Sequence, residues 1–113
     1  RQHRFEVWVS SRGVPLVEPS ACGVLINSTP LGLAPNDPLP INLDEFPRAT
    51  TAFDMVYATG ETAWIRSLRS RVQRSGDGRG MLVAQGAAAF ERWFPGKRAP
   101  VEVMRAAVDV ALR

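Results

Sequence analysis

Two short, continuous apolar runs constrain the fold of this 113-residue chain more than any other feature. The first covers residues 22–27 and the second covers residues 52–57. Runs of this kind suit strands that are buried on both faces, as in parallel sheets. The segment between them carries five prolines, which leave room for one short helical turn at 43–46. The two runs therefore predict a parallel strand pair joined by a crossover connection.

Helical patterns dominate the second half of the chain. Apolar residues at 64, 68 and 72 predict an amphipathic surface helix that ends at the glycine-rich segment 76–80. Residues 81–94 are apolar on nearly every face, which predicts a helix buried between layers or against a second domain. Gly96 ends that helix, and Pro100 suits the first position of a last helix. Its apolar stripe consists of Val101, Met104, Val108 and Ala111.

The start of the chain adds two extended segments. Residues 5–9 alternate between apolar and polar side chains, as in a strand, and residues 14–17 form a second, shorter extended piece. Strands and helices together place the chain in the α/β class. We find no internal repeat and no domain boundary within it. The first residue is Arg rather than Met, so we expect the chain to be cut from a longer one.

Composition excludes several classes of function. Apolar residues make up 45% of the chain, but no run reaches the roughly 18 residues that a membrane helix needs, so we expect no membrane partner. Cys22 and His3 are the only residues of their kinds, which argues against a disulfide, a His/Cys metal cluster and a Ser-His-Asp site. The net charge of +3 is low for a nucleic-acid binder. The arginine cluster at 66, 69, 71 and 74 is therefore predicted to be a solvated helix face.

Two polar segments follow predicted strands, where open α/β sheets bind their ligands. The segment 27–32, Asn-Ser-Thr-Pro-Leu-Gly, either meets a ligand or forms a turn set by its proline and glycine. Ser11 and Arg12 follow the first predicted strand. In a dinucleotide fold an arginine there can pair with a 2′-phosphate, and the alternative is a solvated loop arginine.

Four further positions are candidates for function. The segment 76–80 departs from the G-x-G-x-x-G pattern and has no predicted strand before it, so it suggests a flexible turn. Gln85 has apolar neighbours three and four positions away, so its amide must bond either to protein groups or to a polar ligand. Asp54 lies within a strand, where a structural role is the commoner one. Tyr57 ends that strand, either packed or reaching toward a ligand.

Three of these segments, in order, resemble motifs of the shikimate dehydrogenases. Residues 27–32 resemble the family's N-A-T-P-L-G motif, and residues 53–57 resemble its F-D-x-V-Y strand. Residues 78–85, Gly-Arg-Gly-Met-Leu-Val-Ala-Gln, resemble its G-L-G-M-L-V-x-Q segment. The resemblance implies a partial Rossmann-like, doubly wound parallel sheet flanked by helices. The whole chain, 1–113, would be the carboxyl-terminal part of a dinucleotide-binding domain. Its last helices would pack toward a substrate domain that this chain lacks.

The resemblance also implies a function and a set of roles. The family reversibly reduces 3-dehydroshikimate to shikimate with NADPH, in the cytoplasmic route to aromatic amino acids. Gln85 and Tyr57 would bind the small-molecule substrate. The cofactor would contact Ser11, Arg12, Asn27, Thr29, Met55, Gly78 and Met81, with Arg12 on the 2′-phosphate. A homodimer is a further implication.

The sequence departs from the family in ways that bear on activity. The catalytic lysine and aspartate of the family have no counterpart here, and neither does its glycine-rich diphosphate loop. Arg79 replaces the usual leucine. We therefore expect this chain to be part of an enzyme and to be inactive alone. Two alternatives stay open, a quinate/shikimate dehydrogenase that uses NAD and a non-catalytic binding module that keeps the fold.

Overall fold

The computed structural model of this chain describes residues 21–113. Within that range the sheet has three parallel strands in the order β1-β2-β3. The strands are β1 (Val24–Asn27), β2 (Thr51–Asp54) and β3 (Arg74–Gly76), and the helices are the 3-10 turn η2 (Leu43–Glu45), α1 (Ala63–Leu68), α2 (Arg79–Trp93) and α3 (Val101–Ala111). The strands predicted at 5–9 and 14–17 lie outside the described residues.

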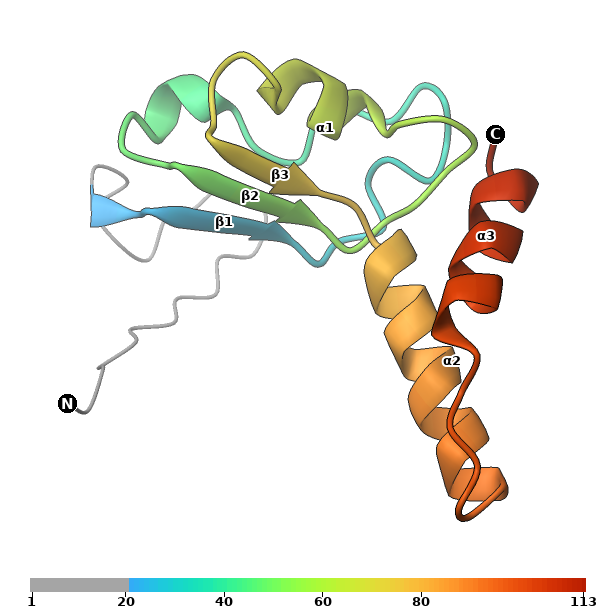
Figure 1. The fold of residues 1–113 in the computed structure, drawn as a ribbon. Helices are drawn as coiled ribbons and strands as arrows, with labels where there is room; N and C mark the ends of the chain where they lie inside the picture. Colours follow the sequence, from blue (N-terminus) through green and yellow to red (C-terminus); the bar gives the residue numbers. More distant parts are fainter. Residues whose placement is uncertain (1–20) are drawn as a thin grey trace, which may run out of the picture.

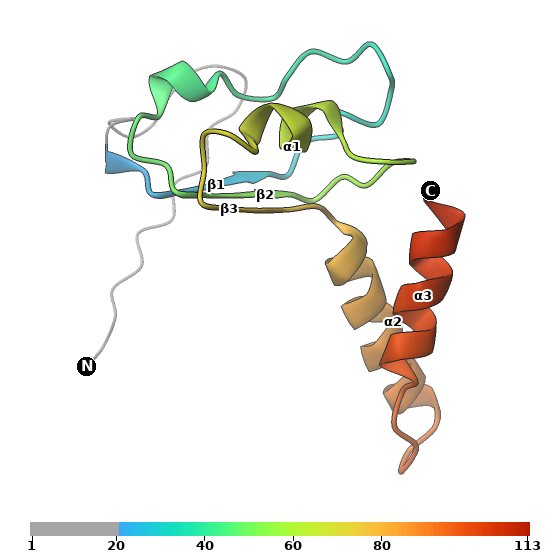
Figure 2. The ribbon, with the colours of Figure 1, turned by 45° about the horizontal axis from the view of Figure 1, so that its top comes forward.

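The elements form a sheet with one helical layer and a projecting helical hairpin. Figures 1 and 2 show α1 and η2 lying over the same face of the sheet. The chain leaves β3 at the carboxyl edge of the sheet and enters α2, and α3 then runs back alongside α2. The hairpin formed by α2 and α3 thus extends away from the sheet rather than covering it.

The core lies between the sheet and the helical layer. Leu68 is fully buried, and Trp64 and Ile65 beside it are also buried, because the apolar side of α1 faces β2 and β3. Leu25 and Ala52 supply the sheet side, while Leu43 and Ala49 close the core from the crossover. Thr62 begins α1, since its hydroxyl accepts a hydrogen bond from the Ile65 amide at 3.3 Å.

The predicted parallel pair with its crossover is confirmed. Val24 is paired with Thr51 and Asn27 with Asp54, and the 3-10 turn at 43–45 lies within the predicted 43–46. The prediction of burial on both faces is wrong for β1. Its residues alternate between exposed and buried, and Val24 and Ile26 are 59% and 57% exposed. The physical reason is that, in the part of the chain that the structure describes, helices cover only one face of the sheet.

The predicted helix through residue 72 is also wrong, because α1 ends at Leu68 and a strand follows. The amides of Arg71 and Val72 donate to the Leu68 carbonyl in a closing turn. The amides of Gln73 and Arg74 then donate to the Thr50 carbonyl, which starts the pairing of β3 with β2. A strand therefore does precede the glycine-rich segment 76–80, contrary to the sequence expectation.

The positions of α2 and α3 agree with the helices predicted from the sequence, but α2 is less buried than predicted. Gly96, at φ +81°, lies in the turn between the helices, and Pro100 caps α3 one position before its first residue. A β-carbon at Gly86 would lie 2.8 Å from the Met104 methyl carbon, so the helices are closely packed there. Val83 is the one buried residue of α2, although the pattern predicts a buried helix. Among the helices of residues 21–113, none combines the length and apolar character needed to cross a bilayer.

We expect Leu68→Ala to lower the free energy of unfolding by about 2–5 kcal/mol, because Leu68 is 0% exposed in a packed core. Leu33→Ala is the matched control, because Leu33 is 64% exposed and its truncation should change stability by less than about 0.5 kcal/mol. Urea unfolding followed by circular dichroism measures both. Equal effects of the two substitutions would contradict the assignment of this core.

Candidate functional site

The carboxyl ends of the three strands meet at one edge of the sheet and carry the candidate site. β1 ends at Asn27, β2 at Asp54 and β3 at Gly76. Because the strands are parallel, the segments that follow them emerge side by side. The three segments singled out in the sequence, 27–32, 53–57 and 78–85, therefore converge at this edge.

Asp54 holds this edge together. Its side chain is 0% exposed, and its two carboxyl oxygens accept three hydrogen bonds. Oδ1 accepts from the Asn27 amide nitrogen at 2.9 Å and from the Val56 backbone N–H at 3.1 Å. Oδ2 accepts from the Thr62 hydroxyl at 2.8 Å. Asp54 thus joins β1, the turn after β2 and the start of α1, which is the structural role that its strand position indicated.

Asn27 and Thr29 are hydrogen-bonded to each other at the start of the loop after β1. The Asn27 amide nitrogen also donates to the Leu31 carbonyl at 3.1 Å. Its side-chain oxygen accepts from the Thr29 backbone N–H at 3.0 Å and from the Thr29 hydroxyl at 2.7 Å. Asn27 is buried and Thr29 is exposed. The pair fixes the shape of the loop after β1, so the turn and the ligand interpretations of this segment are compatible.

Asp37 stabilises the next part of that loop, residues 32–37, through hydrogen bonds to its backbone. One of its carboxylate oxygens accepts hydrogen bonds from the backbone N–H groups of Gly32 and Ala34, each at 2.9 Å. These bonds, the one from Ala34 foremost, hold the pKa of Asp37 below its ordinary value. A cavity of about 400 Å³ lies between residues 32–40 and the segment 58–66. The proline-rich crossover is therefore a folded loop beside the strand ends.

Gly78 brings the third segment into close contact with the second. A β-carbon at this position would lie 2.2 Å from the Met55 carbonyl oxygen and 3.1 Å from Cδ1 of Tyr57. Its amide donates to the Val56 carbonyl at 3.1 Å, and its carbonyl accepts from the Leu82 amide at 2.9 Å. Only glycine allows the start of α2 to approach the end of β2 this closely. The glycine of the third motif is therefore required by packing.

The remaining predicted site residues divide into three groups. Met55 and Tyr57 are each 38% exposed beside Gly78. Met81 is half-buried and Gln85 is exposed, and their spacing from Gly78 places both on one face of α2. Gln85 has no need of a partner inside the protein here, since its amide is open to solvent. Ser11 and Arg12 lie outside the described residues.

The sequence analysis did not single out Thr62, which is 2% exposed and donates to Asp54. A threonine directly before an apolar helical pattern is a helix-start signal, and it could have identified the position.

The arginine cluster is largely balanced by local carboxylates. Arg69 pairs with Glu61, and Arg71 pairs with Asp44, which agrees with a solvated face. The prediction of a single helix face is wrong, because α1 ends at Leu68, so that Arg71 lies in the turn after the helix and Arg74 lies in β3.

Comparison with known proteins shows which family the chain resembles. A family model described as the shikimate 5′-dehydrogenase C-terminal domain matches residues 78–108. A shikimate dehydrogenase (NADP(+)) of Nitrobacter winogradskyi is 39% identical over 90 residues, which is 80% of this chain. The chain is similar to the shikimate dehydrogenases. It covers 32% of the length of that relative, so it spans about a third of such a protein.

Solved structures of shikimate dehydrogenases share the fold. One, in complex with NADP+, superposes with a TM-score of 0.75 at 27% identity, covering 86% of this chain and 34% of that chain. The shikimate 5-dehydrogenase of Thermus thermophilus, in complex with shikimate, gives a TM-score of 0.65 at 28% identity, covering 88% of this chain and 36% of that one. The predicted resemblance and the partial Rossmann-like α/β class are thereby confirmed.

We expect Gly78→Ala to destabilise the protein by about 1–3 kcal/mol, because the added methyl group would overlap the Met55 carbonyl oxygen. Gly80→Ala is the matched control. It lies two residues further along the same helix in open space, and alanine should stabilise that helix by up to about 1 kcal/mol. Thermal unfolding of both variants measures the difference. A Gly78→Ala protein as stable as the wild type would refute the close approach.

We expect the loop 32–37 to loosen in acid. The pKa of Asp37 is lowered in the folded protein, so its stabilising effect is present above the unfolded pKa and is lost as pH falls through the folded one. An NMR titration of the Gly32 and Ala34 amides measures this. Both signals should shift at a pH below 3.8, and Asp37→Asn should abolish the shift. Midpoints above 3.8 would contradict the hydrogen-bonded geometry.

Proposed function

We propose that the protein is an NADP-linked shikimate dehydrogenase and that this chain is part of its cofactor-binding region. One observation carries the proposal. The three family-like motifs are far apart in the sequence, and the fold brings them together where β1, β2 and β3 end. Open α/β sheets bind their ligands outside this edge.

The residues at this edge fit a nicotinamide group. Gly78 carries no side chain, so no side-chain atoms of its own shield the backbone carbonyl at the start of α2. Its carbonyl oxygen accepts one bond from Leu82 and keeps a second lone pair for a carboxamide N–H. Met55 and Met81, both partly exposed, would supply apolar contacts. When bound, NADPH supplies the hydride that converts a carbonyl group to an alcohol.

Gln85 is proposed to orient the substrate. It lies seven residues after Gly78 along α2, which is about 10 Å at the helical rise of about 1.5 Å per residue. Its exposed amide can both donate to and accept from substrate hydroxyl groups. Tyr57, half-exposed beside Gly78, is proposed to line the same space. The proton for the new alcohol would come from a lysine outside this chain.

The hairpin of α2 and α3 is proposed to pack against a substrate domain. It leaves large apolar side chains exposed, with Trp93 at 74%, Phe94 at 53% and Val103 at 68%. Isolated soluble surfaces seldom leave such groups together uncovered. Val24 and Ile26 on β1 are also exposed, and no helix within residues 21–113 covers them, so they form a second surface that the rest of a dinucleotide-binding domain would cover.

The proposal also covers the preference for NADP, the cellular location and the oligomeric state. Arg12 is proposed to pair with the 2′-phosphate of NADP, with Ser11 beside it, since an arginine after a strand of this fold accommodates that group. The enzyme is further proposed to be cytoplasmic, to act on shikimate and to be a homodimer.

The test uses the protein expressed from its full natural gene, assayed with 3-dehydroshikimate and NADPH. Gln85→Ala should lower kcat/KM by about 1–3 kcal/mol in transition-state stabilisation, the cost of one lost amide hydrogen bond. Gln73→Ala is the matched control, because Gln73 is also exposed and precedes β3, at the amino end of the strand rather than at the carboxyl ends that carry the candidate site. It should leave kcat/KM unchanged.

Each other outcome counts against a defined part of the proposal. An unchanged kcat/KM in Gln85→Ala removes Gln85 from the site. Preferred turnover of quinate with NAD favours a quinate/shikimate dehydrogenase instead. A wild-type protein that binds NADPH but turns over neither substrate favours a binding module.

A further inference from the structure

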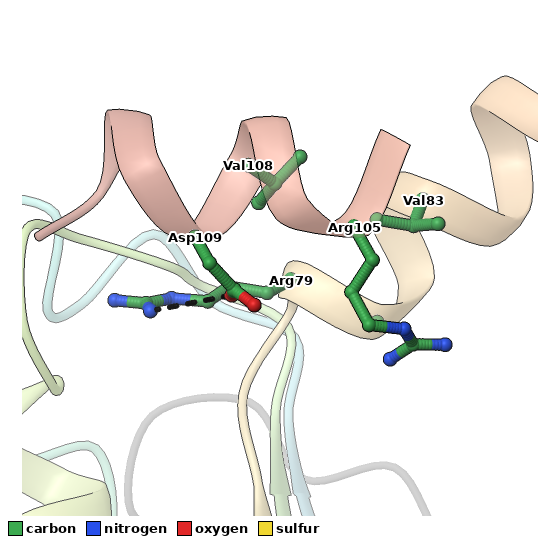
Figure 3. A pocket seen from close by; sticks show the side chains of 6 residues that line it. Arg79, Val83, Arg105, Val108 and Asp109 are labelled. Carbon is green, nitrogen blue, oxygen red and sulfur yellow. Dashed lines mark ion pairs between the residues drawn. The ribbon is translucent and has the colours of Figure 1, made fainter. Parts of the chain in front are cut away.

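A small cavity of about 60 Å³ separates the first turns of α2 from the last turns of α3. Figure 3 shows Arg79, Val83, Arg105, Val108 and Asp109 around it. Arg79 is the side chain that joins the two helices, since its Nη1 lies 4.0 Å from Oδ1 of Asp109. Its side chain is 23% exposed, whereas Arg105 lies on the exposed side of α3. The two arginines therefore differ in environment although they border the same cavity.

Arg79 connects three separate parts of the chain. Its Nη2 is within hydrogen-bonding distance of the backbone carbonyl oxygens of Ala58 at 2.9 Å, of Gly60, and of Leu112 at 3.0 Å. Ala58 and Gly60 belong to the loop after β2, and Leu112 is the C-cap residue of α3. The Gly60 amide also donates to the Leu112 carbonyl at 2.9 Å. One guanidinium thus gathers the loop, the start of α2 and the end of α3.

The chemistry of the contact is specific to arginine. The guanidinium presents five N–H donors in a planar arrangement, so one group can serve several carbonyl oxygens at once. The last carbonyls of a helix have no partner within the helix and carry partial negative charge, so a cation near them is favoured. Asp77 lies on the other side of the group, with its Oδ2 3.2 Å from Nε of Arg79. A leucine at this position could make none of these contacts.

We propose that Arg79 is a positioning residue that latches the end of α3 onto the loop after β2. Gly78 is packed against Met55 and acts as the pivot of the hairpin, while Arg79, one residue later, sets the angle of the hairpin to the sheet. The consequence for the site rests on the proposed function. Gln85 is carried by α2, so the angle set by Arg79 decides where its amide lies relative to the strand ends.

Hydrogen exchange of the full-length protein, followed by NMR or mass spectrometry, tests the latch. Arg79→Leu should speed exchange of the Gly60 and Leu112 amides at least tenfold, and Arg79→Lys should have an intermediate effect because a single ammonium replaces the planar donors. Arg105→Leu is the matched control and should leave both amides at the wild-type rate. The Met55 amide, which donates to the Asn27 carbonyl inside the site, should be unchanged in all three variants.

Wild-type exchange at Gly60 and Leu112 in Arg79→Leu would overturn the latch, and so would equal acceleration in Arg105→Leu. If Arg79→Leu does not fold, Arg79→Lys decides, because an unchanged Gly60 amide in that variant overturns the latch equally. The exchange measurement needs neither cofactor nor substrate. A wild-type protein without shikimate dehydrogenase activity would therefore contradict the proposed function separately. In the active enzyme, a KM for shikimate unaffected by Arg79→Leu would overturn the positioning of Gln85.

Discussion

The carboxyl group of Asp54 is the constraint on which the rest of this structure depends. A fully buried carboxyl group is costly to remove from water unless its oxygens receive hydrogen bonds. Here it receives them from Asn27 on β1, from the Val56 amide and from Thr62 at the start of α1. The group can be satisfied only when the neighbouring strand and the covering helix are both in place. Satisfying one side chain thus requires the parallel pair, the turn and the helix to form together.

The geometry of the strand ends follows from that requirement. Asn27 is held by Asp54 and in turn holds Thr29, so the loop after β1 has a defined shape. The turn after β2 places the Met55 carbonyl where a glycine alone can lie opposite it. The residues predicted to bind ligands therefore fall into two groups, those that shape the strand ends and those that are exposed beside them. Asn27 and Gly78 shape the candidate site, while the side chains of Met55, Tyr57 and Gln85 are exposed beside it.

Much of this fold could be predicted from the sequence because the relevant signals were local. The apolar runs identified β1 and β2, and the glycine and proline after residue 94 delimited α3. β3 was missed because Arg-Ser-Gly at 74–76 has no strand pattern of its own. Its backbone is extended because it pairs with Thr51–Phe53, which is a tertiary cause. The same limit applies to the site, since the sequence placed Gln85 in apolar surroundings and only the packing of α2 shows its amide to be exposed.

The parallel arrangement has a consequence for how the chain reaches this state. Val24 pairs with Thr51, 51 − 24 = 27 residues later, and Thr51 pairs with Arg74, 74 − 51 = 23 residues later. Neither pairing can begin as a local hairpin, so each must first meet the entropy cost of closing a loop. The α2 and α3 pair contacts over a short connection and can form early. We therefore expect the slow step of folding to be the joint closure of the two loops around β2, with helix growth complete before it.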